Sequence, residues 1–217
     1  MHGLNEDHTS PMVHSVWEHY LDAMHKRGQS ANAIFLAHPK RTGVDFWDWL
    51  HGKPVDENPV EQGIEALDDM VDHTNKLCSP ARLVLVGYSA GAWSVDVWLR
   101  NASPALKSQV VGVVLLGDPQ WYDEKHGNRG LAHLFGFGFD PKKDPYIPPE
   151  WMSRIQSWCV SGDPVCGTGY GTSASEAARQ AADAATMLVT RKCTTHCAYI
   201  PEATRHGGRF LAGLSTR

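Results

Sequence analysis

Long apolar runs and an excess of basic charge are both missing from this chain. No stretch approaches the roughly 18 consecutive apolar residues that a membrane-spanning helix needs. The formal net charge is −4, and the charged residues are spread without long runs of one sign. The sequence therefore offers no basic surface for nucleic acid, and we expect neither a transmembrane segment nor a nucleic-acid partner.

Internal repeats and a recognisable export signal are also missing. The chain opens on Met1-His2-Gly3 and continues with polar residues, whereas a signal peptide needs an apolar stretch there. At 217 residues the chain is long enough for one α/β core. We therefore expect a single domain over residues 1–217.

Segments with helical and with strand periodicity alternate along the chain. Apolar residues at helical spacing predict helices at 11–27, 60–77, 90–101, 174–188 and 201–214. Short apolar runs predict strands at 33–37, 82–86, 110–116 and 154–160. Because these strands are apolar throughout and are separated by helices, the pattern predicts an α/β fold with a central parallel sheet covered by helices on both faces.

The most informative stretch is 82–91, where an apolar strand runs into Gly87-Tyr88-Ser89-Ala90-Gly91. In a G-x-S-x-G turn the glycines remove side chains that would clash at the bend, so the serine hydroxyl stands above the sheet edge. The amide of Ala90, at the start of the next helix, then points to where an acyl oxyanion would form. A glycine-rich turn that happens to contain serine is the alternative. The strand before and the helix after favour Ser89 as a nucleophile.

The partners of Ser89 are sought at the carboxyl ends of strands, where catalytic groups of such sheets collect. Asp118 and Asp163 each follow a predicted strand, and Asp163 is the favoured acid. Among twelve histidines, His196 lies after that acid and just before the C-terminal helix, whereas His206 falls within or caps the helix. A serine needs a base, and the base needs an acid that fixes its tautomer, so the order Ser, Asp, His is the one that this fold supplies.

Several segments between about residues 80 and 212 resemble the cutinase family. The elbow at 87–91 is similar to its G-Y-S-Q-G motif, and residues 158–166 look like its C-x-x-G-D-x-x-C acid loop. Residues 196–199 are similar to its H-x-x-Y base segment. The strand end at 114–119 is like that of actinobacterial members.

This resemblance implies a three-layer, cutinase-like α/β-hydrolase fold and a serine esterase that works through an acyl-enzyme. It implies Ser89 as nucleophile, Asp163 as orienting acid and His196 as base, with the backbone amides of Ala90 and Leu4 forming the oxyanion hole. No cofactor and no metal are implied. The expected substrate is a lipid, a cutin-like polyester or a small acyl ester, and we expect a monomer.

The chain departs from the family pattern in three places. Ala90 replaces the usual glutamine of the elbow. The gap from Asp163 to His196 is longer than usual and holds an alanine-rich helix. Residues 2–6 resemble the loop that follows the family's first strand, yet that strand is absent, so we interpret the start of the chain as trimmed or misassigned.

Five cysteines accompany these motifs. Cys159 and Cys166 flank the acid loop, and a disulfide between them would hold Asp163 in place. Cys193 and Cys197 flank the base in the same way, although a reduced or a metal-bound pair is an alternative; a zinc site there would lack its second half. Cys78 is left over. Disulfides around a catalytic loop indicate an oxidising compartment, so we expect a secreted protein.

Two other classes of function stay open at this point. One is an acyltransferase or thioesterase, or a phage-type esterase of mycolyl cell-wall lipid, that uses the same triad. The other is a non-catalytic binding module that keeps the fold. The presence of Ser89, Asp163 and His196 together argues against the binding module.

Overall fold

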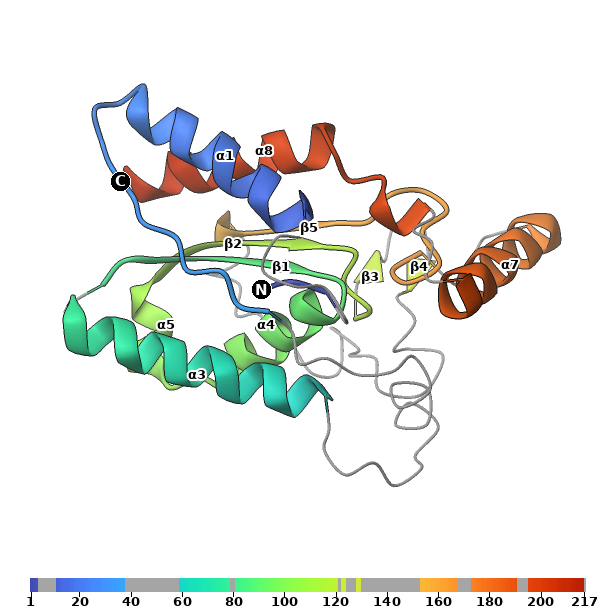
Figure 1. Ribbon diagram of the computed structural model, residues 1–217, viewed down its shortest axis with the longest axis horizontal. Coiled ribbons are helices and arrows are strands. Elements are labelled where there is room, and N and C mark those ends of the chain that lie inside the picture. Colours follow the sequence, from blue (N-terminus) through green and yellow to red (C-terminus); the bar gives the residue numbers. More distant parts are fainter. Residues whose placement is uncertain are drawn as a thin grey trace.

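A computed structural model describes residues 1–3, 11–37, 59–78, 81–120, 122–123, 128–129, 153–167, 173–190 and 195–216. In these residues the central sheet has three parallel strands in the order β1-β2-β5 (Figure 1), which confirms the parallel arrangement. They are β1 (Leu83–Tyr88), β2 (Val110–Leu116) and β5 (Ile155–Trp158). A separate antiparallel pair joins β3 (Tyr122–Asp123) and β4 (Asn128–Arg129).

Helices cover both faces of the sheet (Figure 1). One face carries α1 (Pro11–His25) and α8 (Glu202–Ser215). The other carries α3 (Pro59–Leu77), α4 (Ala90–Asn101) and α5 (Pro104–Gln109). Helix α7 (Ala174–Thr190) projects from the end of the sheet at which β1, β2 and β5 finish. None of the helices described is long and apolar enough to cross a membrane.

Strand β2 shows why the strands read as apolar throughout. Val113 and Leu115 pack with α3 and α4, whereas Val114 and Leu116 pack with α1 and α8. Successive side chains of a strand point to opposite faces, so a strand covered on both sides needs apolar residues at every position. All four of these side chains are fully buried.

The three strands end in register. Tyr88 pairs with Leu116, and Leu116 pairs with Trp158. The residues that follow these three positions therefore emerge side by side at one edge of the sheet. This edge is where the candidate site lies.

The first three residues lie beside β1, at the edge away from β2. The amino group of Met1 donates to Val86 O, and Tyr88 N donates to Met1 O over 3.1 Å. His2 is fully buried, and its N–H donates to Leu36 O over 3.0 Å. The bonds to Val86 and Tyr88 join Met1 to β1 in the pattern of a parallel partner.

The predicted strand at 33–37 is wrong, because the structure has an irregular segment there. Ile34 is 54% exposed, so the apolar run is not buried as a strand of this sheet would be. Helix α5 was not expected, although Ser103 and Pro104 give the signal for it. Ser103 Oγ accepts a bond from Leu106 N over 3.3 Å, and Pro104 holds the first helical position.

Candidate active site

Ser89 sits on a strained strand-to-helix turn. Its backbone angles are φ 55° and ψ −125°. Among the described residues, Ser89 is the only one other than glycine with a positive φ. Ser89 N donates to Leu116 O over 2.9 Å, and its carbonyl accepts the first bond of α4 from Trp93 N. A Cβ on Gly87 would lie 2.6 Å from Ala92 Cα, so the bend requires glycine there. The predicted elbow geometry is therefore present.

Ala90 opens α4, and the first backbone amides of a helix have no partner within it. The start of this helix lies against the start of the chain: a Cβ on Gly91 would lie 2.2 Å from His2 O. Leu4, the second expected oxyanion donor, lies outside the described residues. Gly3 is the last residue described before it.

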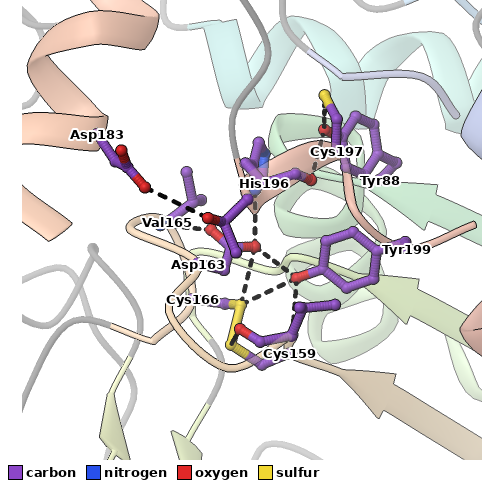
Figure 2. A network of polar contacts seen from close by, with 11 residues as sticks. Tyr88, Cys159, Asp163, Val165, Cys166, Asp183, His196, Cys197 and Tyr199 are labelled. Carbon is purple, nitrogen blue, oxygen red and sulfur yellow. Dashed lines mark hydrogen bonds and ion pairs between the residues drawn. A yellow bond between two sulfur atoms is a disulfide. The ribbon is translucent and has the colours of Figure 1, made fainter. Parts of the chain in front are cut away.

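Asp163 is fully buried at the end of the sheet where β5 finishes. Its Oδ1 accepts from Val165 N over 2.7 Å, and its Oδ2 accepts from His196 Nδ1 over 2.8 Å and from the Tyr199 hydroxyl over 2.5 Å (Figure 2). Burial alone would raise the pKa of Asp163, but the charge of His196 and the hydrogen bonds from these three residues outweigh burial and lower it. Asp163 is therefore held as a carboxylate.

The predicted disulfide between Cys159 and Cys166 is confirmed. It closes the loop around Asp163, and Cys166 Sγ lies 3.2 Å from Asp163 Oδ2. These three residues group closely enough to suggest a metal site, but a disulfide leaves no thiolate to act as ligand. Cys78 is free and exposed, as expected for the cysteine left over.

Cys197 is also disulfide-bonded. Cys193, its expected partner, lies outside the described residues, so that pairing stays a prediction. Because Cys197 follows His196 directly, its bond restrains the segment that carries the imidazole. The alternative of a reduced or metal-bound Cys197 is wrong.

His196 lies in a short 3-10 helix, η2 (Thr195–Cys197), and is buried. Its ring stacks on Tyr88 with centroids 5.0 Å apart, and the Tyr88 hydroxyl donates to His196 O over 3.0 Å. Gly117, which follows β2, approaches the imidazole so closely that a Cβ there would lie 2.7 Å from His196 Cε1. The imidazole is thus fixed in position by residues from β1, from the end of β2 and from the acid loop.

The far nitrogen of this imidazole, Nε2, is buried and has no hydrogen-bond partner in the described part of the chain. Ser89 follows Tyr88 directly, so the nucleophile elbow and the ring that stacks on His196 are neighbours in sequence. A hydrogen bond from Ser89 Oγ to Nε2 is not formed in this structure. Catalytic bonds of this kind commonly tighten only when substrate is bound.

Helix α7 occupies the long interval between Asp163 and His196. Gln180 Nε2 donates to Gly167 O over 3.1 Å, and Thr195 Oγ1 donates to Asp183 Oδ2 over 3.3 Å. The helix is therefore bonded to the acid loop at one point and to the segment before the imidazole at another. The inserted helix lets the chain return to the same sheet edge.

The alternative acid and base have other surroundings. Asp118 is buried after β2, where its Oδ1 accepts from Gln120 N over 2.9 Å, and none of the hydrogen bonds among described residues joins it to His196. His206 lies on α8, as expected, with an exposed side chain that stacks on Trp158. The structure brings Asp163 and His196 together and leaves Asp118 and His206 apart from them.

The sequence model of the Cutinase family matches residues 24–213 of this chain. The chain belongs to the cutinase family. Acetylxylan esterase 2 of Talaromyces purpureogenus is 26% identical over an alignment of 196 residues that covers 78% of this chain and 81% of that protein. Cutinase 11 of Verticillium dahliae is 32% identical over 126 residues, and carboxylesterase Culp1 of Mycobacterium tuberculosis is 31% identical over 101. These last two matches span 42% and 41% of the relatives' own lengths.

Solved structures agree on the fold. An acetylxylan esterase structure has a TM-score of 0.61 with 23% identity and covers 98% of this chain and 96% of its own. A cutinase-like protein from Cryptococcus sp. has a TM-score of 0.57 with 16% identity and covers 98% and 90%. Together with the esterase relatives, the comparisons confirm a cutinase-like α/β-hydrolase fold and indicate a carboxylic ester hydrolase.

Three residues that contact Asp163 or His196 were not predicted as part of the candidate site: Tyr88, Gly117 and Tyr199. Tyr199 is the tyrosine of the H-x-x-Y segment, and Gly117 follows β2 directly. Both were visible as motif residues. Their contacts with the acid and base depend on the register of three strand ends, which local sequence patterns do not reveal.

Proposed function

We propose that Ser89, His196 and Asp163 form the catalytic triad with which this cutinase-family protein hydrolyses carboxylic esters. The observation that carries the proposal is the buried Asp163–His196 pair, with 2.8 Å between Oδ2 and Nδ1, beside the strained elbow of Ser89. Because the carboxylate binds Nδ1, the neutral imidazole keeps its proton there and presents Nε2 as the base.

In the reaction, His196 Nε2 takes the proton of Ser89 Oγ as that oxygen attacks the ester carbonyl. The tetrahedral intermediate then expels the alcohol, which receives the proton from the imidazolium, and an acyl-enzyme remains. Water, activated by the same imidazole, attacks the acyl carbonyl and releases the acid and free Ser89. Asp163 stays ionised throughout and stabilises the imidazolium.

The backbone amides of Ala90 and Leu4 are the proposed oxyanion donors. Support for Ala90 comes from its place at the amino end of α4, where amide dipoles favour negative charge. Support for Leu4 comes from the contact of His2 O with Gly91, which brings the start of the chain to the elbow.

The substrate class follows from the relatives' names. They are named acetylxylan esterase, cutinase and carboxylesterase, and the bond that such enzymes hydrolyse is a carboxylic ester. We propose an acyl ester as substrate here. We also propose an extracellular location, supported by the Cys159–Cys166 disulfide, which persists in oxidising compartments.

An activity-based probe tests the triad directly. A fluorophosphonate should label Ser89 stoichiometrically in folded protein, and p-nitrophenyl esters of increasing acyl length should be hydrolysed by the same preparation. Ser89→Ala should lose labelling and nearly all turnover, whereas Ser108→Ala, an exposed serine of α5, should keep both. Labelling at another residue, or none in a folded sample, would exclude Ser89 as nucleophile.

A further inference from the structure

The hydroxyl of Tyr199 meets the same carboxylate oxygen as the imidazole does. It donates to Asp163 Oδ2 over 2.5 Å, and His196 Nδ1 lies 2.8 Å from that oxygen (Figure 2). We infer that Tyr199 is a positioning residue that fixes the orientation of Asp163 and shares its negative charge with His196. This inference rests on the proposed triad and assigns to it a fourth member that does not touch substrate.

The neighbours of the Tyr199 hydroxyl determine which group receives its hydrogen bond. The oxygen accepts from Val160 N over 3.3 Å and lies 3.1 Å from Cys166 Sγ, so its remaining donor capacity is directed at Asp163. Burial, and then the negative charge of Asp163, raise the pKa of Tyr199 far above its ordinary value. The phenol therefore keeps its proton at neutral pH, and it acts as a donor to the carboxylate.

The carboxylate is held at both oxygens as a result. Oδ1 accepts from Val165 N, and Oδ2 accepts from Tyr199 and His196. Rotation of the carboxyl group about its Cβ–Cγ bond would break all of these bonds at once. A carboxylate that cannot rotate keeps Oδ2 on Nδ1, which is what fixes the tautomer of the base.

Tyr199 also couples the acid to the base through the chain. It follows His196 by three residues, and the turn between them is closed by the bond from Ala198 N to Thr195 O over 3.0 Å. The ring of Tyr199 meets the imidazole edge-on, with centroids 6.3 Å apart and the planes at 89°. One short segment thus supplies both donors to Oδ2, so their separation is fixed by local geometry.

Replacing Tyr199 by phenylalanine removes the hydroxyl and keeps the ring. Without the Tyr199 bond the carboxyl group of Asp163 can rotate away from His196 Nδ1, and this loss of orientation should lower kcat for p-nitrophenyl esters about tenfold with KM nearly unchanged. The carboxylate, with one donor fewer, stabilises the imidazolium more strongly. The acid limb of kcat/KM against pH should therefore move to higher pH, because the imidazole must be neutral to act as base.

A further readout and a control variant separate positioning from mere packing. The low-field proton resonance of His196 Nδ1–H should move further downfield in Tyr199→Phe, because Asp163 becomes a stronger acceptor. The matched control is Tyr20→Phe, which removes a buried phenol hydroxyl between α1 and α8 that lies 3.0 Å from Ser215 Oγ. This control should keep the kcat, the pH profile and the resonance of the parent protein.

Rates are normalised to fluorophosphonate-titrated sites, so a loss of folded protein does not count as a loss of kcat. If Tyr199→Phe keeps kcat within twofold, with the acid limb and the resonance unchanged, while Asp163→Asn is crippled, Tyr199 is not a positioning residue. If Asp163→Asn is itself fully active, the proposed triad is wrong instead. The two failures are therefore distinguishable.

Discussion

Two buried aspartates follow neighbouring strands of this sheet in the same tripeptide. Gly117-Asp118-Pro119 follows β2, and Gly162-Asp163-Pro164 lies in the loop after β5. Both glycines have positive φ, 61° and 85°. Both aspartates accept a backbone N–H from two residues on, Gln120 N for Asp118 and Val165 N for Asp163. The two acids therefore share a preceding glycine with positive φ and the same local hydrogen bond.

Their remaining surroundings differ. At Asp163, the charge of His196 and the donors on the carboxylate outweigh burial and lower its pKa. At Asp118, burial dominates over the Gln120 amide and the charge of Arg100, and its pKa is raised to about 7. The residues that make this difference come from distant parts of the chain, so the tripeptide alone does not make a catalytic acid.

Asp118 faces a second buried acid. Asp96 on α4 is fully buried, neither of its carboxylate oxygens has a hydrogen-bond partner among the described residues, and its nearest cation is Arg100 at 3.9 Å. Burial, and then the charge of Asp118, raise the pKa of Asp96 well above its ordinary value. The surroundings of Asp163 thus favour the ionised carboxylate, whereas those of Asp96 and Asp118, the proton-holding cluster, favour the protonated acid.

Of the changes predicted here, removal of the His196 imidazole should lower kcat most. We expect His196→Ala to lower kcat by about 10⁵-fold or more, as loss of the base of a serine triad does. His206→Ala is the matched control, because His206 is exposed on α8, and it should stay within a few-fold of the parent rate. The measurement is p-nitrophenyl ester turnover per mole of protein, with folding checked by circular dichroism, because a fluorophosphonate does not titrate Ser89 once its base is removed. Severe loss in His206→Ala with activity kept in His196→Ala would reassign the base.

The two acids themselves come next in expected size. Asp163→Asn should lower kcat about 10⁴-fold, because an amide in place of the carboxylate favours the wrong tautomer of His196. Asp118→Asn should change kcat only a few-fold, since it has no hydrogen bond to the imidazole. Steady-state kinetics of both variants, with folding checked by circular dichroism, measure the difference. Comparable losses in the two would remove the distinction drawn between them.

Much of this site could be predicted from the sequence where the signal is local. The elbow needs only a strand, two glycines around Ser89 and a helix start, and all of these are contiguous. Helix α4 and strand β2 have the predicted bounds for the same reason. The Cys159–Cys166 disulfide was predicted because the two cysteines flank the acid loop, seven positions apart in sequence.

What could not be predicted depends on tertiary register. Local sequence patterns do not reveal that Tyr88, Leu116 and Trp158 are paired at the ends of their strands. This register brings Gly117 into close contact with the imidazole. The segment at 33–37 has the composition of a strand, but Ile34 is 54% exposed there and the segment is not part of the sheet. Propensity gave the wrong answer there because burial decides whether an apolar run becomes a strand.

Gly117→Ala tests the same comparison with a smaller expected effect on kcat. Gly117 precedes Asp118 in sequence, but it lies against His196, the partner of Asp163. A Cβ there would lie 2.7 Å from His196 Cε1 and 3.2 Å from the Tyr199 hydroxyl. Gly117→Ala should displace the imidazole and lower kcat about 10- to 100-fold. Gly28→Ala is the control: its φ is also positive, at 68°, but nothing lies within 4 Å of an added Cβ. It should lose stability through backbone strain and keep kcat.

Equal kcat losses in Gly117→Ala and Gly28→Ala would mean that strain, and not contact with His196, controls the rate. A loss confined to Gly117→Ala separates the two causes. Thermal unfolding midpoints of both variants, measured beside the kinetics, show whether the strain itself is matched.

The smallest expected effect concerns stability at the proton-holding cluster. A carboxyl whose pKa rises on folding keeps a proton that the unfolded chain releases, so the stability of the fold falls as pH rises from the ordinary 3.8 towards about 7. Asp96→Asn removes one of these groups. It should raise the free energy of unfolding at pH 8 by about 1 kcal/mol, or roughly 2–4 °C in midpoint, and change it little at pH 4.

The control for this last prediction is Asp22→Asn on the exposed face of α1, where Lys26 donates to the carboxylate and lowers its pKa. An exposed pair of this kind contributes little, so its midpoint should move by no more than about one degree at either pH. Scanning calorimetry at pH 4 and pH 8 measures all four differences. If Asp96→Asn loses stability at pH 8, the buried carboxylate has a stabilising partner. The Asp118 cluster would then hold charge as the Asp163 cluster does, and the contrast between the two acids would be lost.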